Sequence, residues 1–143
     1  MEIKNRSVFH EFAIEDRLTA GMVLKGTEVK SIREGKVNFT DSYCFFHQGE
    51  LWIKGLHIAE YRLGTSSNHI AVHDRKLLLT KKELRKWEQK IKEKGYTIVP
   101  LRIFFNENNL AKMELGLAKG KKLHDKRESI KQRDVEREMR KYK

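Results

Sequence analysis

The fold is decided by the stretch VPLRIFFNENNLAKMELGL, residues 99–117. Apolar residues alternate with other residues from Val99 to Phe105, and the alternation resumes from Ala111 to Leu117. Period-two alternation is typical of a half-buried β-strand, and the intervening NENN is rich in residues that favour turns. The stretch therefore predicts a β-hairpin with one buried face.

A proline and a second hairpin refine this picture. Pro100 lies inside a predicted strand and has no backbone N–H to donate, so we expect an edge position or a β-bulge there. A second hairpin is predicted across residues 48–50, with an aromatic strand over 43–47 before it and a strand over 51–58 after it. Two or more hairpins indicate a mainly β fold, a small antiparallel barrel.

One helix is predicted by a capping box. Thr80 and Glu83 have the spacing at which each side chain bonds the backbone N–H of the other residue. Apolar residues then recur at helical spacing from Leu84 to Ile91, and Gly95 is expected as the left-handed residue that ends the helix.

A shorter helix is predicted from Thr27 to Glu34. Val29 and Ile32 would face inward, and Gly35 would end the helix. A helix of this length depends on packing for its stability. The expected architecture is therefore a β-barrel with flanking helices.

Composition points to a nucleic-acid partner. The chain has 143 residues, enough for one domain, with 31 Lys and Arg against 20 Asp and Glu and a formal charge of +11. The surplus positive charges repel one another unless a polyanion offsets them. Residues 119–143 hold eleven Lys or Arg and five Asp or Glu, a net +6, which leaves +5 for residues 1–118.

The sequence also bounds where the protein works. No stretch approaches the roughly 20 apolar residues of a membrane span, and residues 1–17 mix charges with no apolar signal core. Cys44 has no cysteine partner and no ligand cluster around it, so we expect a buried, unreactive side chain in a reducing cytoplasm. His69 and His73 are four residues apart, but the sequence around them has no Glu in the position that a metalloprotease motif needs. We expect no metal, no cofactor and no membrane.

Residues 119–143 are expected to form a tail. Their few apolar residues form no continuous stripe, so the segment cannot bury enough surface to offset its ordering entropy. We expect it to be disordered alone and helical on an anionic partner, with a solvated charged helix as the alternative. The expected division is a barrel over 1–118 and a tail over 119–143.

Seven short blocks of the sequence stand out together: residues 26–31 (GTEVKS), 35–36 (GK), 41–43 (DSY), 75–79 (RKLLL), 95–97 (GYT), 118–122 (AKGKK) and 124–127 (HDKR). In order and spacing they resemble the SmpB family of tmRNA-binding proteins. The resemblance implies an oligonucleotide-binding-fold-like barrel. It further implies a non-enzymatic adaptor that binds the tRNA-like domain of tmRNA and delivers it to bacterial ribosomes stalled without a stop codon, where the nascent chain is tagged.

The resemblance also implies the site and the partners. The expected tmRNA-binding residues are Thr19, Ala20, Gly21, Lys76, Leu78, Thr80 and Lys112, with Ala20 and Gly21 in a turn. The expected ribosome-binding residues are Lys119, Gly120, Lys121, Lys122, His124, Asp125, Lys126 and Arg127, acting at the decoding centre and mRNA channel of the small subunit. Elongation factor Tu and alanyl-tRNA synthetase would be indirect partners through tmRNA.

Two departures from the family pattern accompany these residues. The family usually has Glu where this chain has Thr19, and it usually has Asp-Pro and further basic residues where this chain has residues 69–74. Four of these residues also have an ordinary structural reading: Gly21 as a turn glycine, Leu78 as a core leucine, Lys112 as a solvated lysine and His124 as a solvated histidine. However, three adjacent leucines in a strand cannot all face inward, so at least one must face out.

Two other functions share this composition. A permanent ribosomal or translation-factor-like RNA-binding protein would have the same size and charge. A small basic nuclease would need a general acid and a general base within reach of one phosphate, and the sequence offers only scattered histidines.

Overall fold

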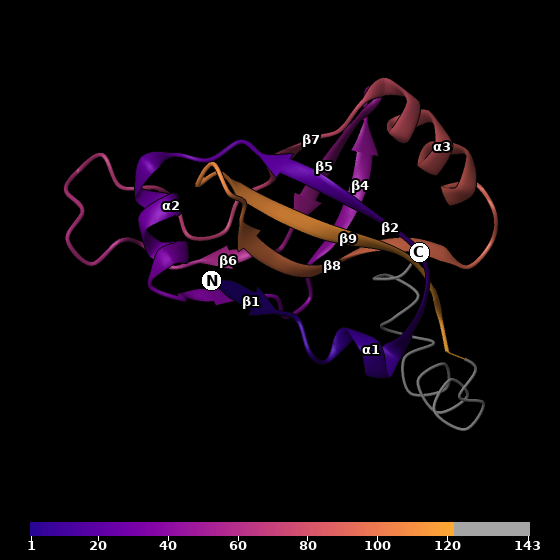
Figure 1. The fold of residues 1–143 in the computed structure, drawn as a ribbon, viewed down its shortest axis with the longest axis horizontal. Helices are drawn as coiled ribbons and strands as arrows, with labels where there is room; N and C mark the ends of the chain where they lie inside the picture. The colour runs from indigo at the N-terminus through magenta and orange to yellow at the C-terminus, as the bar shows by residue number, and fades with distance from the viewer. Residues whose placement is uncertain (122–143) are drawn as a thin grey trace, which may run out of the picture.

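The fold is built on one curled antiparallel sheet within residues 1–121, the part of the chain that our computed structural model describes. Seven strands follow the order β1-β8-β4-β5-β7-β2-β9, and β8 also pairs with β9, which closes the sheet into a barrel. Two further strands, β3 and β6, form a separate small sheet (Figure 1). The fold is mainly β with flanking helices, as predicted.

The elements have the following bounds. The strands are β1 (Glu2–Lys4), β2 (Phe12–Met22), β3 (Val37–Asn38), β4 (Tyr43–His47), β5 (Glu50–Lys54), β6 (His57–Ile58), β7 (Arg75–Leu78), β8 (Tyr96–Phe105) and β9 (Ala111–Gly120). The helices are α1 (Val8–Glu11), α2 (Gly26–Arg33) and α3 (Lys81–Ile91).

The hairpin predicted from residues 99–117 is the pair β8–β9, and it is confirmed. Its register shifts between Pro100 and Arg102, so Pro100 sits beside a β-bulge, which is one of the two positions expected for it. Both strands are longer than the alternating pattern. β9 runs to Gly120, two residues past the boundary expected between barrel and tail, and Lys119 pairs with both Ala13 and Tyr96.

The hairpin β4–β5 is also confirmed, but the expected strand over 51–58 is wrong because it splits in two. β5 ends at Lys54, and β6 begins at His57 and pairs with β3 instead. Gly55 between them has a φ of 81°, a left-handed conformation that breaks the strand. Cys44 in β4 is 5% exposed, and burial raises the pKa of its thiol.

The long strand β2 was not predicted, and the expected turn at Ala20 and Gly21 is wrong. Both residues lie inside β2, which pairs with β9 along most of its length and with β7 at its end. Small residues carry little strand signal of their own, so their conformation is set by the strands on either side.

Both predicted helices form. In α3, Glu83 N–H donates to Thr80 Oγ1 at 3.1 Å and Thr80 N–H donates to Glu83 Oε1 at 2.9 Å, which completes the capping box. The helix ends at Ile91, and Gly95, with a φ of 89°, belongs to the following turn rather than to the helix end.

Helix α2 has a different inner face from the one predicted. Ile32 is buried as expected, but Val29 is only half-buried, and Glu28 and Ser31 are the other buried residues. A carboxylate therefore occupies a position that spacing alone assigns to an apolar side chain.

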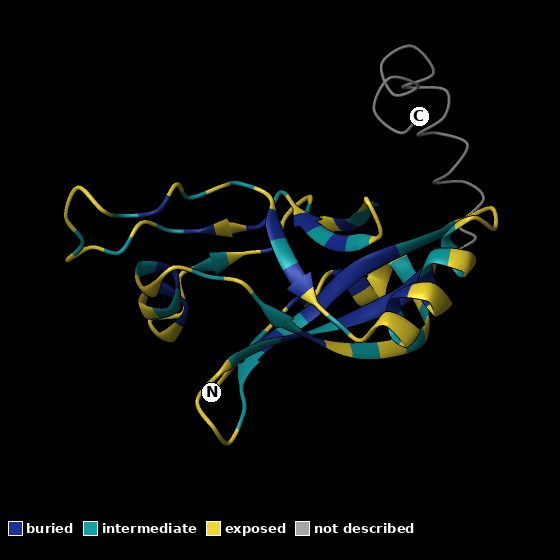
Figure 2. Cartoon of the chain, turned by 90° about the horizontal axis from the view of Figure 1, so that it is seen from above, coloured by how far each residue is buried: buried dark blue, intermediate teal, exposed yellow. Residues whose placement is uncertain are grey.

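The core fills the inside of the barrel. Large buried side chains come from β5, β7, β8 and β9 and from α2 and α3: Ile32, Leu51, Ile53, Leu77, Trp87, Ile98, Ile103 and Met113. In Figure 2 the buried residues lie along the strands, whereas the loop between β6 and β7 projects from the barrel and is largely exposed. No helix within residues 1–121 combines the length and apolar character that a membrane span needs.

Gly55 and Gly49 provide a matched test of the bend that separates β5 from β6. Both have positive φ, 81° and 79°, but a Cβ on Gly55 would lie 2.7 Å from the backbone oxygen of Asp41, whereas a Cβ on Gly49 would meet no atom within 4 Å. Gly49→Ala should cost about 1–2 kcal/mol of unfolding free energy for the left-handed backbone. Gly55→Ala should cost about 1–3 kcal/mol more from the clash. Urea unfolding measures both, and equal losses would contradict the close approach at Asp41.

Candidate nucleic-acid interface

Three strands bring Gly21, Leu78 and Lys112 to one place on the barrel. Gly21 in β2 pairs with Leu78 of β7 on one side and with Lys112 of β9 on the other. A Cβ built on Gly21 would lie 3.4 Å from Leu78 Cβ and 3.6 Å from Lys112 Nζ. The glycine thus lies between an apolar and a cationic side chain, and both close in on the space that a side chain of its own would occupy.

Strand alternation decides which neighbours share this surface. Thr19 is exposed and lies two residues before Gly21, on the same face of β2. Ala20 is 0% exposed and faces the core, so the predicted role of Ala20 does not extend to its side chain. Glu114 pairs directly with Thr19, which places a carboxylate on β9 beside the position where the family usually has Glu.

Two further predicted residues lie on β7 and just beyond it. Leu77 faces the core, whereas Leu78 is 50% exposed, which confirms that at least one leucine of the run faces out. Lys76 shares the outer face with Leu78, and its Nζ lies 3.9 Å from Glu50. Thr80 is exposed, but its hydroxyl accepts the α3 capping bond, so its side chain serves the helix.

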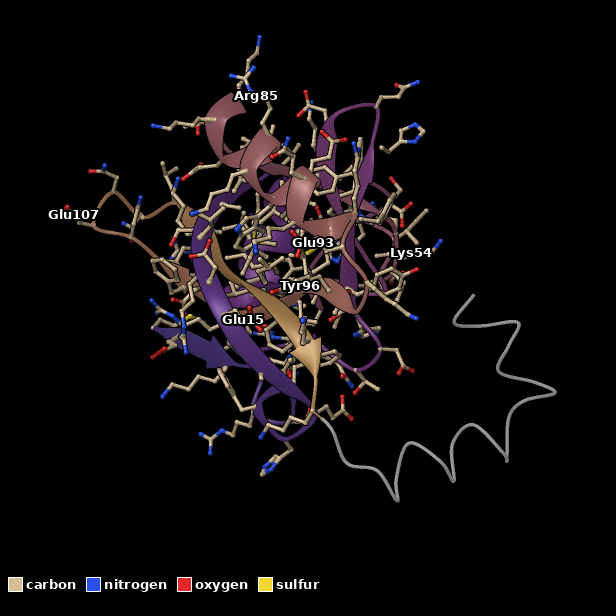
Figure 3. The ribbon with its side chains drawn as sticks, turned by 90° about the vertical axis from the view of Figure 1, so that its right-hand side faces the viewer. Glu15, Lys54, Arg85, Glu93, Tyr96 and Glu107 are labelled. Atoms are coloured by element: carbon tan, nitrogen blue, oxygen red, sulfur yellow. The ribbon has the colours of Figure 1, made fainter. Side chains whose placement is uncertain are left out.

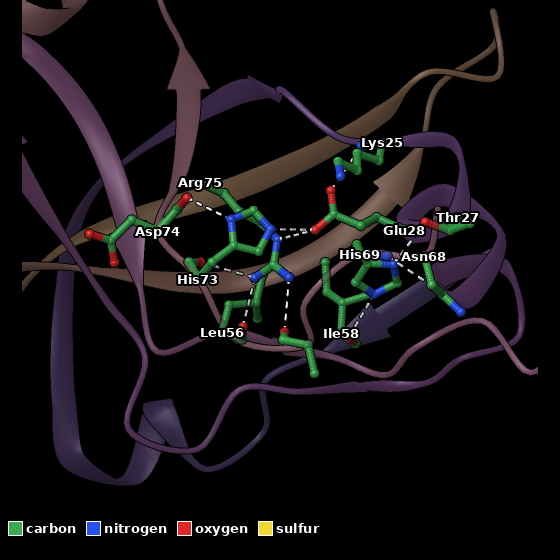
Figure 4. A network of polar contacts seen from close by, with 11 residues as sticks. Lys25, Thr27, Glu28, Leu56, Ile58, Asn68, His69, His73, Asp74 and Arg75 are labelled. Carbon is green, nitrogen blue, oxygen red and sulfur yellow. Dashed lines mark hydrogen bonds and ion pairs between the residues drawn. The ribbon is translucent and has the colours of Figure 1, made fainter. Parts of the chain in front are cut away.

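A buried ion pair anchors β7 to α2 (Figure 4). Arg75 Nε donates to Glu28 Oε2 at 2.7 Å, and the side chains are 0% and 1% exposed. Arg75 also donates to the backbone oxygens of Leu56, His73 and Ala71 at 2.7, 3.3 and 2.9 Å. One guanidinium therefore ties the start of β7 to α2 and to the segments on both sides of the long loop.

Glu28 stays ionised in this setting. Burial alone would raise the pKa of its carboxyl, but bonds from the Lys25 backbone N–H, Arg75 and His73 outweigh burial and leave that pKa below its ordinary value of 4.5. His73 Nε2 lies 2.8 Å from Glu28 Oε2, and its Nδ1 lies 3.0 Å from the backbone oxygen of Asp74.

The other histidine considered for a metal site has a structural role as well. His69 is 2% exposed, with Nε2 2.9 Å from the backbone oxygen of Ile58 and Nδ1 2.9 Å from Thr27 Oγ1. Since a carbonyl only accepts, Nε2 donates to it, and in the tautomer that carries its proton on Nε2 the Nδ1 atom accepts from the Thr27 hydroxyl. The 69–74 loop is thus held against α2 and β6.

Sequence reasoning missed this network, although its spacing was visible. Glu28 lies four residues before Ile32, on the inner face of a helix, and Arg75 lies two residues before Leu77, on the inner face of a strand. A buried charge needs a partner, so two inward charges of opposite sign predict each other. That signal could have found the pair.

The far end of β9 carries the start of the predicted ribosome-binding segment. Lys119 Nζ lies 4.7 Å from the centre of the Tyr96 ring, and Lys121 N–H donates to the backbone oxygen of Glu11 at 3.0 Å. Tyr96 donates a 2.6 Å hydrogen bond to Glu15, which raises the pKa of Tyr96 to about 12 (Figure 3). Lys119, Gly120 and Lys121 are therefore tied to the barrel.

The remaining residues predicted for the ribosome lie outside the described part of the chain. These are Lys122, His124, Asp125, Lys126 and Arg127. Within residues 1–121, no three His, Cys, Asp or Glu side chains are grouped so that they could hold a metal ion.

Comparison with known proteins gives consistent matches over almost the full length. The model of the SmpB protein family matches residues 2–143. An SsrA-binding protein of Phocaeicola vulgatus is 56% identical over 139 residues, covering 97% of this chain and 93% of that protein. One from Geobacter sulfurreducens is 56% identical over 135 residues, covering 94% and 88%.

A solved structure matches as well. It is described as "tmRNA-SmpB: a journey to the center of the bacterial ribosome", and its matching chain superposes with a TM-score of 0.74 at 48% identity, covering 95% of each chain.

The buried pair yields a stability prediction. Arg75→Leu should lower the unfolding free energy by about 3–5 kcal/mol, because Glu28 would keep a buried charge without its partner. The double variant Glu28→Gln/Arg75→Leu should be more stable than Arg75→Leu, since no charge is then buried. Arg62→Leu is the control: Arg62 is 64% exposed, 3.2 Å from Glu34, and its loss should cost at most about 1 kcal/mol. Urea unfolding decides, and a double variant no more stable than the single would refute this account.

Proposed function

Because the chain belongs to the SmpB protein family, we propose that it binds the tRNA-like domain of tmRNA and delivers it to bacterial ribosomes stalled without a stop codon. The observation that carries this proposal is the meeting of Gly21, Leu78 and Lys112, from three distant segments, on one exposed surface. Relatives that are more than half identical are named for binding SsrA, the tmRNA, and the matching solved structure is described as tmRNA with SmpB in the ribosome.

The chemistry of the surface suits structured RNA. Such RNA is recognised through phosphates, 2′-hydroxyls and exposed bases, and shape matters more than sequence. Gly21 adds no side chain that would hold a ribose or phosphate away from this surface, Lys112 offers a cation beside it, and the half-exposed Leu78 offers an apolar contact. In this proposal the barrel holds the RNA without performing chemistry on it.

The proposed adaptor role extends to other partners. The tRNA-like domain would bring elongation factor Tu and alanyl-tRNA synthetase to the complex, although neither would need to touch this chain. The basic C-terminal residues would contact ribosomal RNA at the decoding centre and in the mRNA channel, which a truncated message leaves empty. We accordingly propose that the protein acts in the cytoplasm.

Salt dependence tests the barrel's part in binding. Lys112→Gln should weaken binding to the tRNA-like domain, and it should reduce the slope of log affinity against log salt by about 0.7–0.9, the value of one lost phosphate contact. Lys94→Gln is a control of equal charge change, since Lys94 lies in the turn after α3. Filter binding across salt concentrations measures both. The site is misassigned if Lys94→Gln and Lys112→Gln change the slope equally.

A second prediction separates RNA binding from delivery. Deleting residues 122–143 leaves the barrel whole, so binding to the tRNA-like domain over a control tRNA should persist while peptide tagging on stalled ribosomes is lost. Replacing Asp125, Lys126 and Arg127 together by Ala should have the same effect. Tagging is measured on a message without a stop codon, at matched ribosome occupancy. Undiminished tagging by the deleted protein would show that these residues are dispensable.

A further inference from the structure

The outer face of the β4–β5 hairpin carries aromatic side chains that the site described above does not use. Phe45 of β4 and Trp52 of β5 are directly opposite each other in the register. Their strand neighbours Cys44, Leu51 and Ile53 are buried in the core, so alternation directs Phe45 and Trp52 outward. Both remain half-buried on this outer face.

These two rings line a small hollow. Its volume is about 200 Å³, and His47 and Asp74 complete its lining. Pockets for drug-sized ligands are larger, about 300–1,000 Å³, so this hollow has room for one planar group rather than for a whole nucleotide. Nucleobases stack readily on aromatic side chains, whatever their sequence.

Cations lie on two sides of the hollow. Lys54 follows Trp52 on the same face of β5, and its Nζ lies 5.9 Å from the centre of the Phe45 ring (Figure 3). Lys76 of β7 pairs directly with Trp52. A base seated between these lysines would have its flanking phosphates within reach of positive charge.

Asp74 adds an acceptor to the lining. It immediately precedes Arg75, whose buried side chain fixes the backbone there, and its carboxylate points away from the Glu28 network (Figure 4). An ionised carboxylate only accepts hydrogen bonds, so it favours base edges that donate. Guanine presents two neighbouring donors, N1–H and the 2-amino group, on its Watson–Crick edge.

The hollow continues the surface formed by Gly21, Leu78 and Lys112. The strands β5, β7, β2 and β9 are neighbours in that order, and Lys76 and Leu78 share the outer face of β7. Adjacent strands are about 4.8 Å apart, so Gly21 on β2 and Trp52 on β5 are separated by about 10 Å across the sheet and, because they pair with Leu78 and Lys76, by about 7 Å along it. One RNA can span both features.

We propose that this hollow binds one unpaired RNA base, stacked on Trp52 and Phe45, with guanine preferred through Asp74. The inference rests on the proposed function for the source of the base, which is the tRNA-like domain of tmRNA. It extends the RNA face beyond the residues that the family resemblance implies, onto β4 and β5.

Substitution of Trp52 tests the proposal. In the full-length protein, Trp52→Leu should weaken binding to the tRNA-like domain about five- to a hundredfold, the effect of losing one stacked base. Trp52→Phe should stay within about threefold, because it keeps an aromatic face. Tyr43→Leu is the matched control: Tyr43 is 44% exposed on the same face of β4 but does not line the hollow. Thermal unfolding shows whether each variant remains folded.

Fluorescence gives a readout that a merely structural role would not produce. Stacking should quench the fluorescence of Trp52 when the RNA is added. This quenching should vanish in Trp52→Phe, whose remaining tryptophan is the buried Trp87. With single-stranded probes, the hexamer UUGUUU should quench more strongly than hexauridylate. Asp74→Asn should remove that difference.

The outcomes separate this inference from the proposed function. Suppose that wild-type protein prefers the tRNA-like domain and that Lys112→Gln lowers the affinity for it. If Trp52→Leu then binds normally and the fluorescence of Trp52 is not quenched, the inference is overturned and the proposed function stands. If wild-type protein shows no preference for the tRNA-like domain but UUGUUU still quenches Trp52, the proposed function fails and the base site stands. Loss of ribosome association in Trp52→Leu, with unchanged affinity for the tRNA-like domain, would assign the hollow to a contact with the ribosome instead of tmRNA and overturn the inference.

Discussion

The double pairing of β9 is the constraint on which the rest of the structure depends. β9 bonds to β2 on one side and to β8 on the other, over nearly its whole length, and so closes the sheet. Closure removes the free edges of these strands and gives the apolar faces of the ring one shared interior. It also places Lys112 beside Gly21, although the two residues are far apart in the sequence and no local structure brings them together.

The buried ion pair of Glu28 and Arg75 fixes the position of a segment that the hydrogen bonds of the barrel do not place. The chain leaves the ring at Gly55 and returns at Arg75, and hydrogen bonds within the ring do not determine where that excursion lies. Two charges in the protein interior are costly to desolvate, so such a pair gives little net stability, but it strongly penalises any arrangement that separates the partners. Here that penalty fixes the start of β7, which carries Lys76 and Leu78 on its outer face.

Local signals predicted much of the fold, and contacts between distant segments account for the rest. The β8–β9 hairpin, the bulge at Pro100 and the α3 cap depend on neighbouring residues, so the sequence pattern was sufficient. The strand conformation of Gly21 depends on β7 and β9, and the need for a glycine at position 55 depends in part on its close approach to Asp41. The site residues followed from family resemblance, because no periodicity indicates that residues 21, 78 and 112 are neighbours.

The length of β9 has a mechanical consequence. Lys112 stands near its beginning and Gly120 is its last residue, and eight steps of about 3.4 Å separate them by about 27 Å. Because β9 is hydrogen-bonded to a strand on each side, it can neither extend nor fold, and this distance is fixed. In the proposed function the barrel would act as a rigid spacer: any contact made by residues 122–143 would start at a set distance from the proposed RNA-binding surface.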